Sequence, residues 1–287
     1  MDAYLREKSR IFGFLKPGGA GVINADDPML VGLAGTLDVP RLVTFGIKHE
    51  ADVRAENIRL LPESTDFDVN AGDHGRFHVR ARLPGLHNVY NMTAAAACLI
   101  CGGIAVPDIK KGLENASSVP GRLEKIESRA PFKVFVDYAH TPDALENVLK
   151  CLRGFTKNRL ICVFGCGGDR DKAKRPLMGR IAAGISDHVI LTSDNPRQED
   201  PEEILRQIEK GMPGGTDYSI IILREQAILK SLELAGEGDV VVIAGKGHED
   251  RQILGGKVIP FDDREVAARI LDKMGYGDAD DPRDRER

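Results

Sequence analysis

Four stretches of polar and charged residues in the second half of the chain each follow an apolar segment. They are Asp137–Asp143, Gly165–Lys172, Ser193–Arg197 and Gly245–Asp250. We expect the apolar segments to be strands of one parallel sheet, and ligands of such sheets bind beyond the carboxyl ends of the strands. A purely structural sheet has no need of such side chains at every strand end. We therefore interpret the four stretches as parts of one binding site.

The residue types in these stretches favour a ligand that carries both carboxylates and ammonium groups. Arg170 and Arg197 each present a guanidinium fork that can form two parallel hydrogen bonds with a carboxylate. Asn195 can donate to a carboxylate or accept from an ammonium, and Glu249 can pair with an ammonium. A ligand with one carboxylate would leave a buried fork unpaired, which is costly. The set therefore fits a zwitterion with a second carboxylate.

The sequence contains no glycine-rich loop of the kinds that bind nucleotide phosphates. The loop Gly165–Arg170 departs from GxGxxG because position 170 is arginine. Gly245-Lys246 and Gly256-Lys257 are followed by Gly and Val, whereas a Walker A loop requires Ser or Thr there.

The bulk composition is that of a globular protein with two domains. The chain has 287 residues, of which 42% are hydrophobic, and its net charge is −4. This charge offers no basic field to attract nucleic acid, so we expect no nucleic-acid partner. No apolar run reaches the roughly 18 residues of a membrane span, so we expect no membrane partner either.

The five cysteines argue against a disulfide framework, because their number is odd. Cys98 and Cys101 form a CxxC inside an alanine-rich run with no second pair at zinc-like spacing. We interpret them as buried helix residues rather than as metal ligands. Free cysteines are typical of a reducing cytoplasm, which is where we expect the protein to lie.

The first part of the chain predicts a mixed sheet and a helix. Gly21–Asn24 and 41–47 are short apolar segments that predict strands. Residues 51–83 alternate between apolar and polar side chains with period two, which is typical of half-exposed antiparallel strands. An alanine-rich segment predicts a helix over Leu86–Ala105 that stops near Pro107.

From about Pro120 onward, strands and helices alternate. The predicted strands are Lys133–Asp137, Leu160–Phe164, His188–Thr192, Ser219–Leu223 and Asp239–Ala244. The predicted helices are Pro142–Arg153, Pro176–Ile185, Pro201–Gly211, Glu225–Ala235 and Arg264–Met274, and the proline that opens three of them indicates a first helical position. The pattern predicts an α/β chain: a partial first domain over 1–117, then a complete Rossmann-like, mostly parallel, doubly wound domain over 118–287.

Six segments in order resemble the ATP-dependent Mur ligases: GLHNVYNMTAAAA, PGRLEKI, VDYAHTPDAL, FGCGGDRDKAKRPLMG, SDNPRQEDP and GKGHED. Their spacing is similar to that of the members that attach meso-diaminopimelate to UDP-MurNAc-L-Ala-D-Glu. The family has three domains, and the resemblance implies the last part of the central ATP-binding domain followed by the whole C-terminal, amino-acid-binding domain. The family's phosphate-binding loop, of the GTxGKTT kind, would precede Met1, so we expect the chain alone to be inactive in ligation.

The resemblance also implies roles in nucleotide and metal binding. It implies that Lys8 is an N6-carboxylysine that holds Mg²⁺, that Asn88 and Asn91 lie by the adenine, that Arg122 lies near the ribose and phosphates, and that Asp137 and His140 face ATP with a catalytic role. From the residues alone, Lys8 would be a solvated helix lysine, and the two asparagines would cap a helix or form a turn.

The resemblance implies a diaminopimelate pocket made of Arg170, Asp194, Asn195, Pro196, Arg197, Gly245 and Glu249. Pro196 lies within the same motif and is expected to shape the pocket. Related ligases that take lysine diverge from arginine at the position of Arg197, which favours diaminopimelate here.

The activity implied is that of an ATP-dependent acid–amino-acid ligase in peptidoglycan precursor synthesis. ATP phosphorylates the carboxylate of UDP-MurNAc-L-Ala-D-Glu, and the amine of meso-diaminopimelate attacks the acyl phosphate. The implied cofactors are ATP and Mg²⁺, and the full-length protein is expected to be a cytoplasmic monomer. The alternatives are a non-catalytic amino-acid-binding module derived from such a ligase, and a Mur ligase that adds lysine or D-Ala-D-Ala. Folate polyglutamylation is a more distant alternative.

Overall fold

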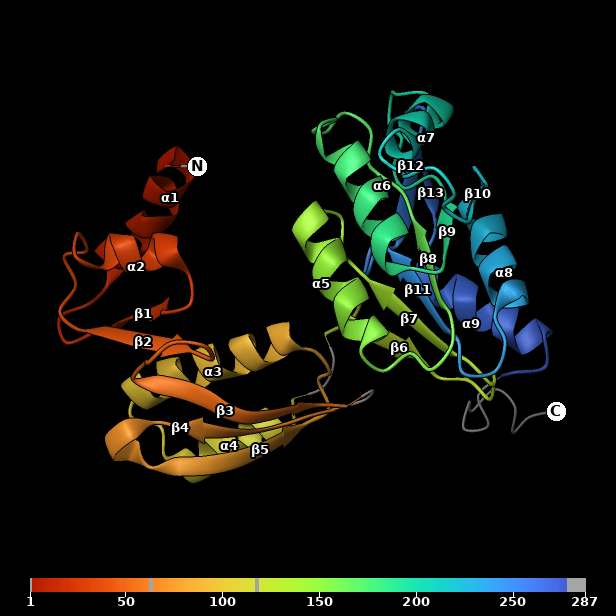
Figure 1. Cartoon of the computed structure of the whole chain (residues 1–287). Coiled ribbons are helices and arrows are strands. Elements are labelled where there is room, and N and C mark those ends of the chain that lie inside the picture. The colour runs from red at the N-terminus through yellow and green to blue at the C-terminus, as the bar shows by residue number, and fades with distance from the viewer. Residues whose placement is uncertain (1, 62–63, 117–118, 278–287) are drawn as a thin grey trace. The chain divides into compact units, whose positions relative to one another are not determined.

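The computed structural model describes residues 2–61, 64–116 and 119–277 (Figure 1). The chain divides into two compact units, Met1–Ser117 and Ser118–Arg287. Each unit has a β-sheet and a hydrophobic core of its own. None of the helices in these described ranges is long and apolar enough to cross a membrane.

The first unit is built on a five-stranded sheet in the order β1-β2-β3-β4-β5. The strands are β1 (Gly21–Asn24), β2 (Leu42–Gly46), β3 (Val53–Leu60), β4 (Thr65–Asn70) and β5 (Arg76–Ala81). The first three strands run parallel, and β4 and β5 are antiparallel to their neighbours. Phe67 and Val69 of β4 are buried while Asp66 and Asp68 face outward, which confirms the period-two pattern.

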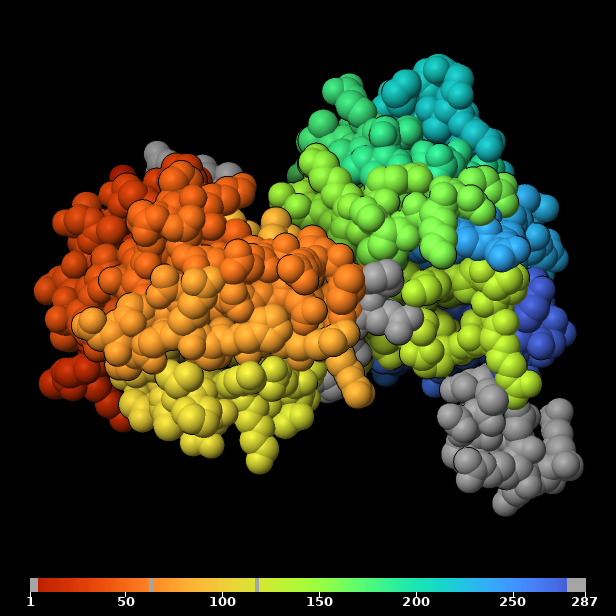
Figure 2. All heavy atoms as spheres, turned by 60° about the horizontal axis from the view of Figure 1, so that its bottom comes forward, coloured from red at the N-terminus to blue at the C-terminus, as the bar shows by residue number. Residues whose placement is uncertain are grey.

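Two helices, α3 (Leu86–Cys101) and α4 (Val106–Glu114), pack against this sheet. The unit also contains α1 (Asp2–Ser9), α2 (Pro28–Ala34) and short 3-10 helices at Arg10–Phe14 and Gly72–His74. Buried residues of α3 and α4, among them Val89, Ala96 and Ile109, join the core beneath the strands. Figure 2 shows the yellow residues of α4 alongside the orange strands of the sheet.

Two predictions for this region are wrong. The helix ends at Cys101, where Gly102 follows it and Gly103 turns the chain with a φ of 78°. Pro107 therefore does not stop a helix but lies in the first turn of α4, where its missing N–H costs nothing. Cys98 is exposed rather than buried, because α3 buries a different face against the sheet.

The second unit is built on a six-stranded sheet in the order β10-β9-β8-β11-β7-β6. The strands are β6 (Glu124–Ile126), β7 (Lys133–Asp137), β8 (Leu160–Phe164), β9 (His188–Leu191), β10 (Tyr218–Ile220) and β11 (Val240–Ala244). All neighbours are parallel except β6 and β7. This arrangement confirms the predicted mostly parallel, doubly wound sheet.

Helices pack on both faces of this sheet (Figure 1). They are α5 (Pro142–Arg153), α6 (Lys174–Ile185), α7 (Pro201–Glu209), α8 (Arg224–Leu234) and α9 (Asp263–Lys273). The central strand β11 shows the reason: Val240 and Val242 join the core under α5, α6 and α7, whereas Val241 and Ile243 join the core under α8 and α9. A strand buried on both faces can place polar side chains only at its ends.

Helix starts and a hairpin show where the prediction was incomplete. Pro142 and Pro201 are first helical residues as predicted. Pro176 is not, because α6 begins two residues earlier at Lys174. The antiparallel hairpin of β12 (Arg251–Leu254) and β13 (Lys257–Pro260) was not predicted.

A fully buried ion pair joins the first residues of α8 and α9. Arg224 donates two hydrogen bonds of 2.7 Å to the carboxylate of Asp263, and both side chains are completely shielded from solvent. The same guanidinium donates to the carbonyl oxygens of Ala244 and Ser193, which lie at the ends of β11 and β9. This pair therefore fixes the two segments that carry most of the predicted binding residues.

Replacing Arg224 by alanine should lower the free energy of unfolding by about 3–5 kcal/mol, because it leaves the buried carboxylate of Asp263 without a partner. Urea unfolding followed by circular dichroism measures this loss. The matched control is Arg269→Ala, which breaks an exposed ion pair with Glu225 between the same two helices. The control should lose no more than about 1 kcal/mol, and equal losses in the two variants would contradict the prediction.

Candidate functional site

The carboxyl ends of β8, β9 and β11 lie next to one another in the second unit. The glycine loop after β8 is hydrogen-bonded to the segment after β9, since the Gly168 N–H donates to the Asn195 carbonyl at 2.9 Å. A Cβ atom on Gly245, after β11, would lie 3.4 Å from the Asp194 carboxylate. Three stretches that are far apart in the sequence therefore meet at one edge of the sheet.

A buried lysine lies at the centre of this edge. Lys246 is completely buried, and its ammonium donates to Asn195 Oδ1 at 3.2 Å and to Glu249 Oε2 at 2.9 Å. The Asn195 amide also donates to Glu249 Oε2, at 2.8 Å. Asp194 Oδ1 lies 3.7 Å from the ammonium and is buried without a hydrogen-bond partner among the described residues. The structure thus joins three predicted residues through a fourth that was not predicted.

The two carboxylates of this network have opposite pKa shifts. Burial raises the pKa of Asp194, and the charges of Arg224 and Lys246 oppose the effect without cancelling it. Burial also acts on Glu249, but the hydrogen bond and charge of Lys246 outweigh it, with help from Asn195 and Arg197, so the pKa of Glu249 lies below its ordinary value. Glu249 is therefore favoured over Asp194 as the ionised partner of Lys246.

Arg197 is held in a strained conformation between the glycine loop and the hairpin. Its φ of 53° lies in the left-handed region that side chains rarely adopt. The backbone N–H of Arg197 donates to the Ile253 carbonyl, and its backbone carbonyl accepts from the Gly255 N–H. Both of these hydrogen-bond partners lie in the hairpin. Arg197 Nη1 donates to the Gly168 carbonyl at 2.7 Å.

Arg170 and Arg197 lie close to the same glycine. A Cβ atom on Gly167 would lie 2.9 Å from Arg197 Nη1 and 3.7 Å from Arg170 Cγ. Arg170 is exposed, and its Nη1 donates to the carbonyl of Asp169 next to it. The two predicted carboxylate-binding residues thus lie beside one glycine, and among the described residues each guanidinium donates one hydrogen bond, to a backbone carbonyl.

An ion pair that the sequence analysis missed supports the glycine loop. Arg175 is completely buried and forms a two-point pair with Glu199, with both distances 2.9 Å. Arg175 also donates to the Gly167 carbonyl, and Glu199 accepts from the Asp169 N–H. The pair therefore ties the loop after β8 to the segment after β9. The two residues lie 24 positions apart, and nothing in their sequence spacing signals the contact.

Glu199 should make stability depend on acid pH. The hydrogen bond from Arg175 is the main reason that its pKa falls to about 2, and burial opposes the shift. A lowered pKa contributes stability that is present above the unfolded-state value and lost as pH falls towards 2. We therefore expect wild type to lose more stability than Glu199→Gln between about pH 6 and about pH 3.

Urea unfolding midpoints at the two pH values measure this difference. Glu202→Gln is the control, because Glu202 is exposed in the first turn of α7. The control should follow the wild-type pH dependence. The same pH dependence in Glu199→Gln as in wild type would contradict the assignment.

The residues predicted to face ATP occupy the carboxyl end of β7. Arg122 lies over the ring of Tyr138 at 4.7 Å, and the ring also contacts His140 and His248. His140 is exposed, and its Nδ1 lies 2.9 Å from the Tyr138 carbonyl. A carbonyl can only accept, so Nδ1 carries the proton and Nε2 of the neutral ring is an acceptor.

Asp137 is buried, and both of its carboxylate oxygens are occupied. Oδ2 accepts from the Leu123 N–H and Oδ1 from the Ala139 N–H, each at 2.7 Å. Burial raises the pKa of Asp137, against the lowering effect of these two hydrogen bonds and of Arg122. This geometry describes Asp137 as the residue that anchors the loop before β6 to the end of β7. A catalytic role for Asp137 stays a prediction.

Three predicted residues belong to the first unit. Lys8 is exposed in α1. Asn88 donates from its amide to the Pro84 carbonyl at 2.8 Å, which is the local turn contact weighed as its alternative role. Asn91 is exposed on α3. Their roles towards adenine and metal stay predictions.

The described residues do not form a magnesium site by themselves. Across 2–61, 64–116 and 119–277, no group of three or more His, Cys, Asp or Glu side chains could hold a metal ion. Magnesium takes oxygen ligands and is usually bound through one or two carboxylates and substrate phosphates. Magnesium binding through a modified Lys8 therefore stays a prediction.

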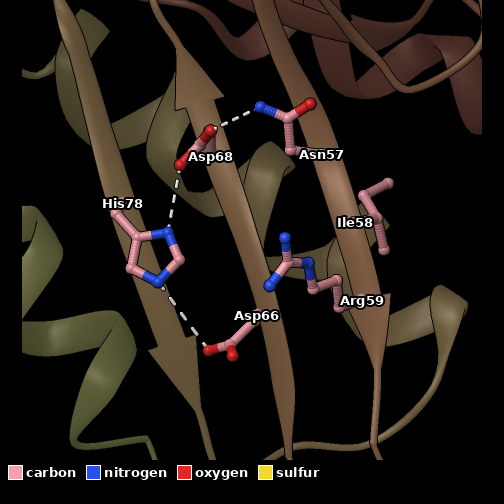
Figure 3. Close-up of a pocket in the computed structure, with 6 residues that line it drawn as sticks. All are labelled: Asn57, Ile58, Arg59, Asp66, Asp68 and His78. Atoms are coloured by element: carbon pink, nitrogen blue, oxygen red, sulfur yellow. Dashed lines mark hydrogen bonds and ion pairs between the residues drawn. The ribbon is translucent and has the colours of Figure 1, made fainter.

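A hollow of about 560 Å³ on the first unit is a poorer candidate for a site (Figure 3). It lies on the outward face of β3, β4 and β5. Asp68 is paired there with Asn57 at 2.8 Å and with His78 at 3.0 Å, and its pKa is lowered to about 2 by these two bonds and by Arg76. Asp68, Asn57 and His78 thus satisfy one another, which is typical of a solvated sheet face.

Two family models match the chain. The model of the Mur ligase middle domain matches residues 1–99, and the model of the Mur ligase, glutamate ligase domain matches residues 121–247. Each match falls in one of the two structural units.

Two curated relatives that are similar to this chain have the same name. The UDP-N-acetylmuramoyl-L-alanyl-D-glutamate–2,6-diaminopimelate ligase of Bacillus licheniformis is 46% identical over 279 residues, which cover 94% of this chain and 56% of the relative. The ligase of the same name from Halalkalibacterium halodurans is 44% identical over 274 residues, with the same two coverages. The chain therefore spans about half the length of the curated relatives it matches.

Solved structures agree with this similarity. A structure of a UDP-N-acetylmuramoyl-L-alanyl-D-glutamate–2,6-diaminopimelate ligase is 35% identical and covers 96% of this chain and 57% of its own, with a TM-score of 0.62. MurF from Acinetobacter baumannii, at 24% identity and a TM-score of 0.70, covers 85% of this chain and 52% of its own and shares the fold. Fold, family models and relatives together define an α/β ligase architecture. The chain belongs to the Mur ligase family.

Proposed function

We propose that this chain carries the amino-acid-binding unit of a ligase that adds meso-diaminopimelate to UDP-MurNAc-L-Ala-D-Glu. The observation that carries the proposal is the convergence of Arg170, Arg197, Asn195 and Glu249 at one edge of the second sheet. Relatives at 44–47% identity that are named as this ligase support it.

The arrangement suits a ligand with two carboxylates and two ammonium groups. Arg170 and Arg197, both near Gly167, would bind carboxylates through their guanidinium forks. Glu249, ionised and partly exposed, would bind an ammonium. Asp194, Pro196 and Gly245 would form the wall behind these groups. L-lysine has one carboxylate, so one fork would stay unpaired and binding would be weaker.

The reaction proposed is amide formation through an acyl phosphate. ATP would supply the phosphoryl group that activates the carboxylate of the nucleotide-linked dipeptide. The second unit would bring the attacking amine of diaminopimelate into position, and such positioning accounts for a large share of the rate in reactions of this kind. Arg122 and His140, on the exposed surface around Tyr138, would contact the nucleotide. We place this activity in the cytoplasm.

Arg197→Ala should weaken the binding of meso-diaminopimelate by on the order of 10- to 100-fold, because it removes a charged hydrogen-bonding partner of a carboxylate. Isothermal titration of the purified chain measures this. The matched control is Arg180→Ala, an exposed arginine of α6, which should bind as wild type does. L-lysine should bind wild type more weakly than meso-diaminopimelate.

Two results would contradict the proposal. One is tight binding of L-lysine and meso-diaminopimelate alike by the wild-type chain, which would show that the second carboxylate is not recognised. The other is an unchanged affinity for meso-diaminopimelate in Arg197→Ala, which would show that the Arg197 guanidinium does not bind the ligand.

A further inference from the structure

Lys246 has no role in the site as proposed so far, yet it is the most buried charge in it. Its side chain is fully shielded from solvent, and it lies within 4 Å of two carboxylates, those of Asp194 and Glu249. A buried ammonium is retained only where its partners compensate the loss of hydration. Lys246 has two effects on the side chains around it.

The first effect of Lys246 is to orient the amide of Asn195. The Oδ1 atom of Asn195 accepts from Lys246 Nζ at 3.2 Å and from the Ile253 N–H at 3.0 Å. Two donors on one side identify that side as the oxygen, so the NH₂ group must point the other way. One of its N–H groups donates to Glu249 at 2.8 Å. Asn195 can therefore offer a ligand only a donor.

The second effect concerns Glu249. Its Oε2 accepts from both Lys246 and Asn195, which fixes that end of the carboxylate. Its Oε1 has no hydrogen-bond partner among the described residues, and the side chain is 31% exposed. The free oxygen is thus left as an acceptor for a cationic group of the ligand.

The ammonium of Lys246 faces the carboxylates of both Asp194 and Glu249, whereas the nearby Arg224 is paired with Asp263. At the open end of the network, Glu249 Oε1 can accept from an ammonium of the ligand, and the second N–H of the Asn195 amide can donate to a carboxylate. The site therefore attracts an ammonium at one end and a carboxylate at the other.

We propose that Lys246 is a positioning residue that sets the polarity of the amino-acid site. It holds Asn195 as a donor to a ligand carboxylate and Glu249 as the partner of a ligand ammonium, and it touches neither ligand group itself. This inference rests on the proposed function, because it assumes that the edge of the second sheet binds a diamino dicarboxylic acid.

The test compares Lys246→Met with Lys230→Met, in which the same change is made at an exposed lysine of α8. Isothermal titration with meso-diaminopimelate should show a loss of affinity on the order of 10- to 100-fold in Lys246→Met and none in the control. Thermal melting identifies variants that remain folded. Lys246→Gln, which keeps a donor but not the charge, is the second variant should methionine prevent folding.

The pH dependence of binding separates positioning from a merely structural role. In wild type, Lys246 keeps the pKa of Glu249 low. Loss of the charge raises the pKa of Glu249. It also raises the pKa of Asp194, which faces the same ammonium. The other nearby cations, Arg197 and Arg224, remain in all variants. As the pH is lowered, the affinity of Lys246→Met and Lys246→Gln for meso-diaminopimelate should therefore begin to fall at a higher pH than the affinity of wild type.

The outcomes distinguish the two proposals. Wild type that does not bind meso-diaminopimelate overturns the proposed function. Wild type that binds, together with folded Lys246 variants whose affinity and pH dependence are unchanged, overturns the role of Lys246 alone. A loss of affinity in folded variants without any shift in the pH dependence also overturns it, because a general disturbance of the loop would produce that result.

Discussion

Charged groups that are shut away from water must find partners, and this constraint organises the second unit. Its parallel strands are buried on both faces, so charge can gather only at their ends. There, Arg224 is paired with Asp263, Arg175 with Glu199, and Lys246 with Glu249. Each pair also bonds to a loop or a side chain of the candidate site. The same contacts that compensate the buried charges therefore hold the ligand-binding groups in place.

The sequence was sufficient for those features that depend on local patterns. Strands such as β7 and β8 were predicted to the residue, because apolar runs buried on both faces are short and sharply bounded. Pro107 was expected to stop a helix but lies in the first turn of the next one, and Pro176 was expected to begin a helix that begins at Lys174, because a proline is tolerated anywhere in the first turn of a helix. The hairpin of β12 and β13 was missed because its outer strand is exposed throughout and shows no alternation.

The candidate site was predictable in its ligand-facing residues and not in its supports. Arg170, Asn195, Arg197 and Glu249 could be found because each follows an apolar strand and has a type that binds charged groups. Glu199 and Lys246 act through other side chains, and their partners are set by how the loops pack. Spacing along the chain carries no trace of such contacts, so only the three-dimensional arrangement reveals which residues orient the site.

The central claim is that the edge formed by β8, β9 and β11 binds meso-diaminopimelate with its carboxylates at the arginines. A crystal structure of the chain grown with this amino acid tests it most directly. The account predicts one carboxylate within hydrogen-bonding distance of the Arg197 guanidinium and the Asn195 amide nitrogen, and an ammonium next to Glu249 Oε1. A ligand bound with an ammonium against Asn195, or bound elsewhere on the unit, would contradict it.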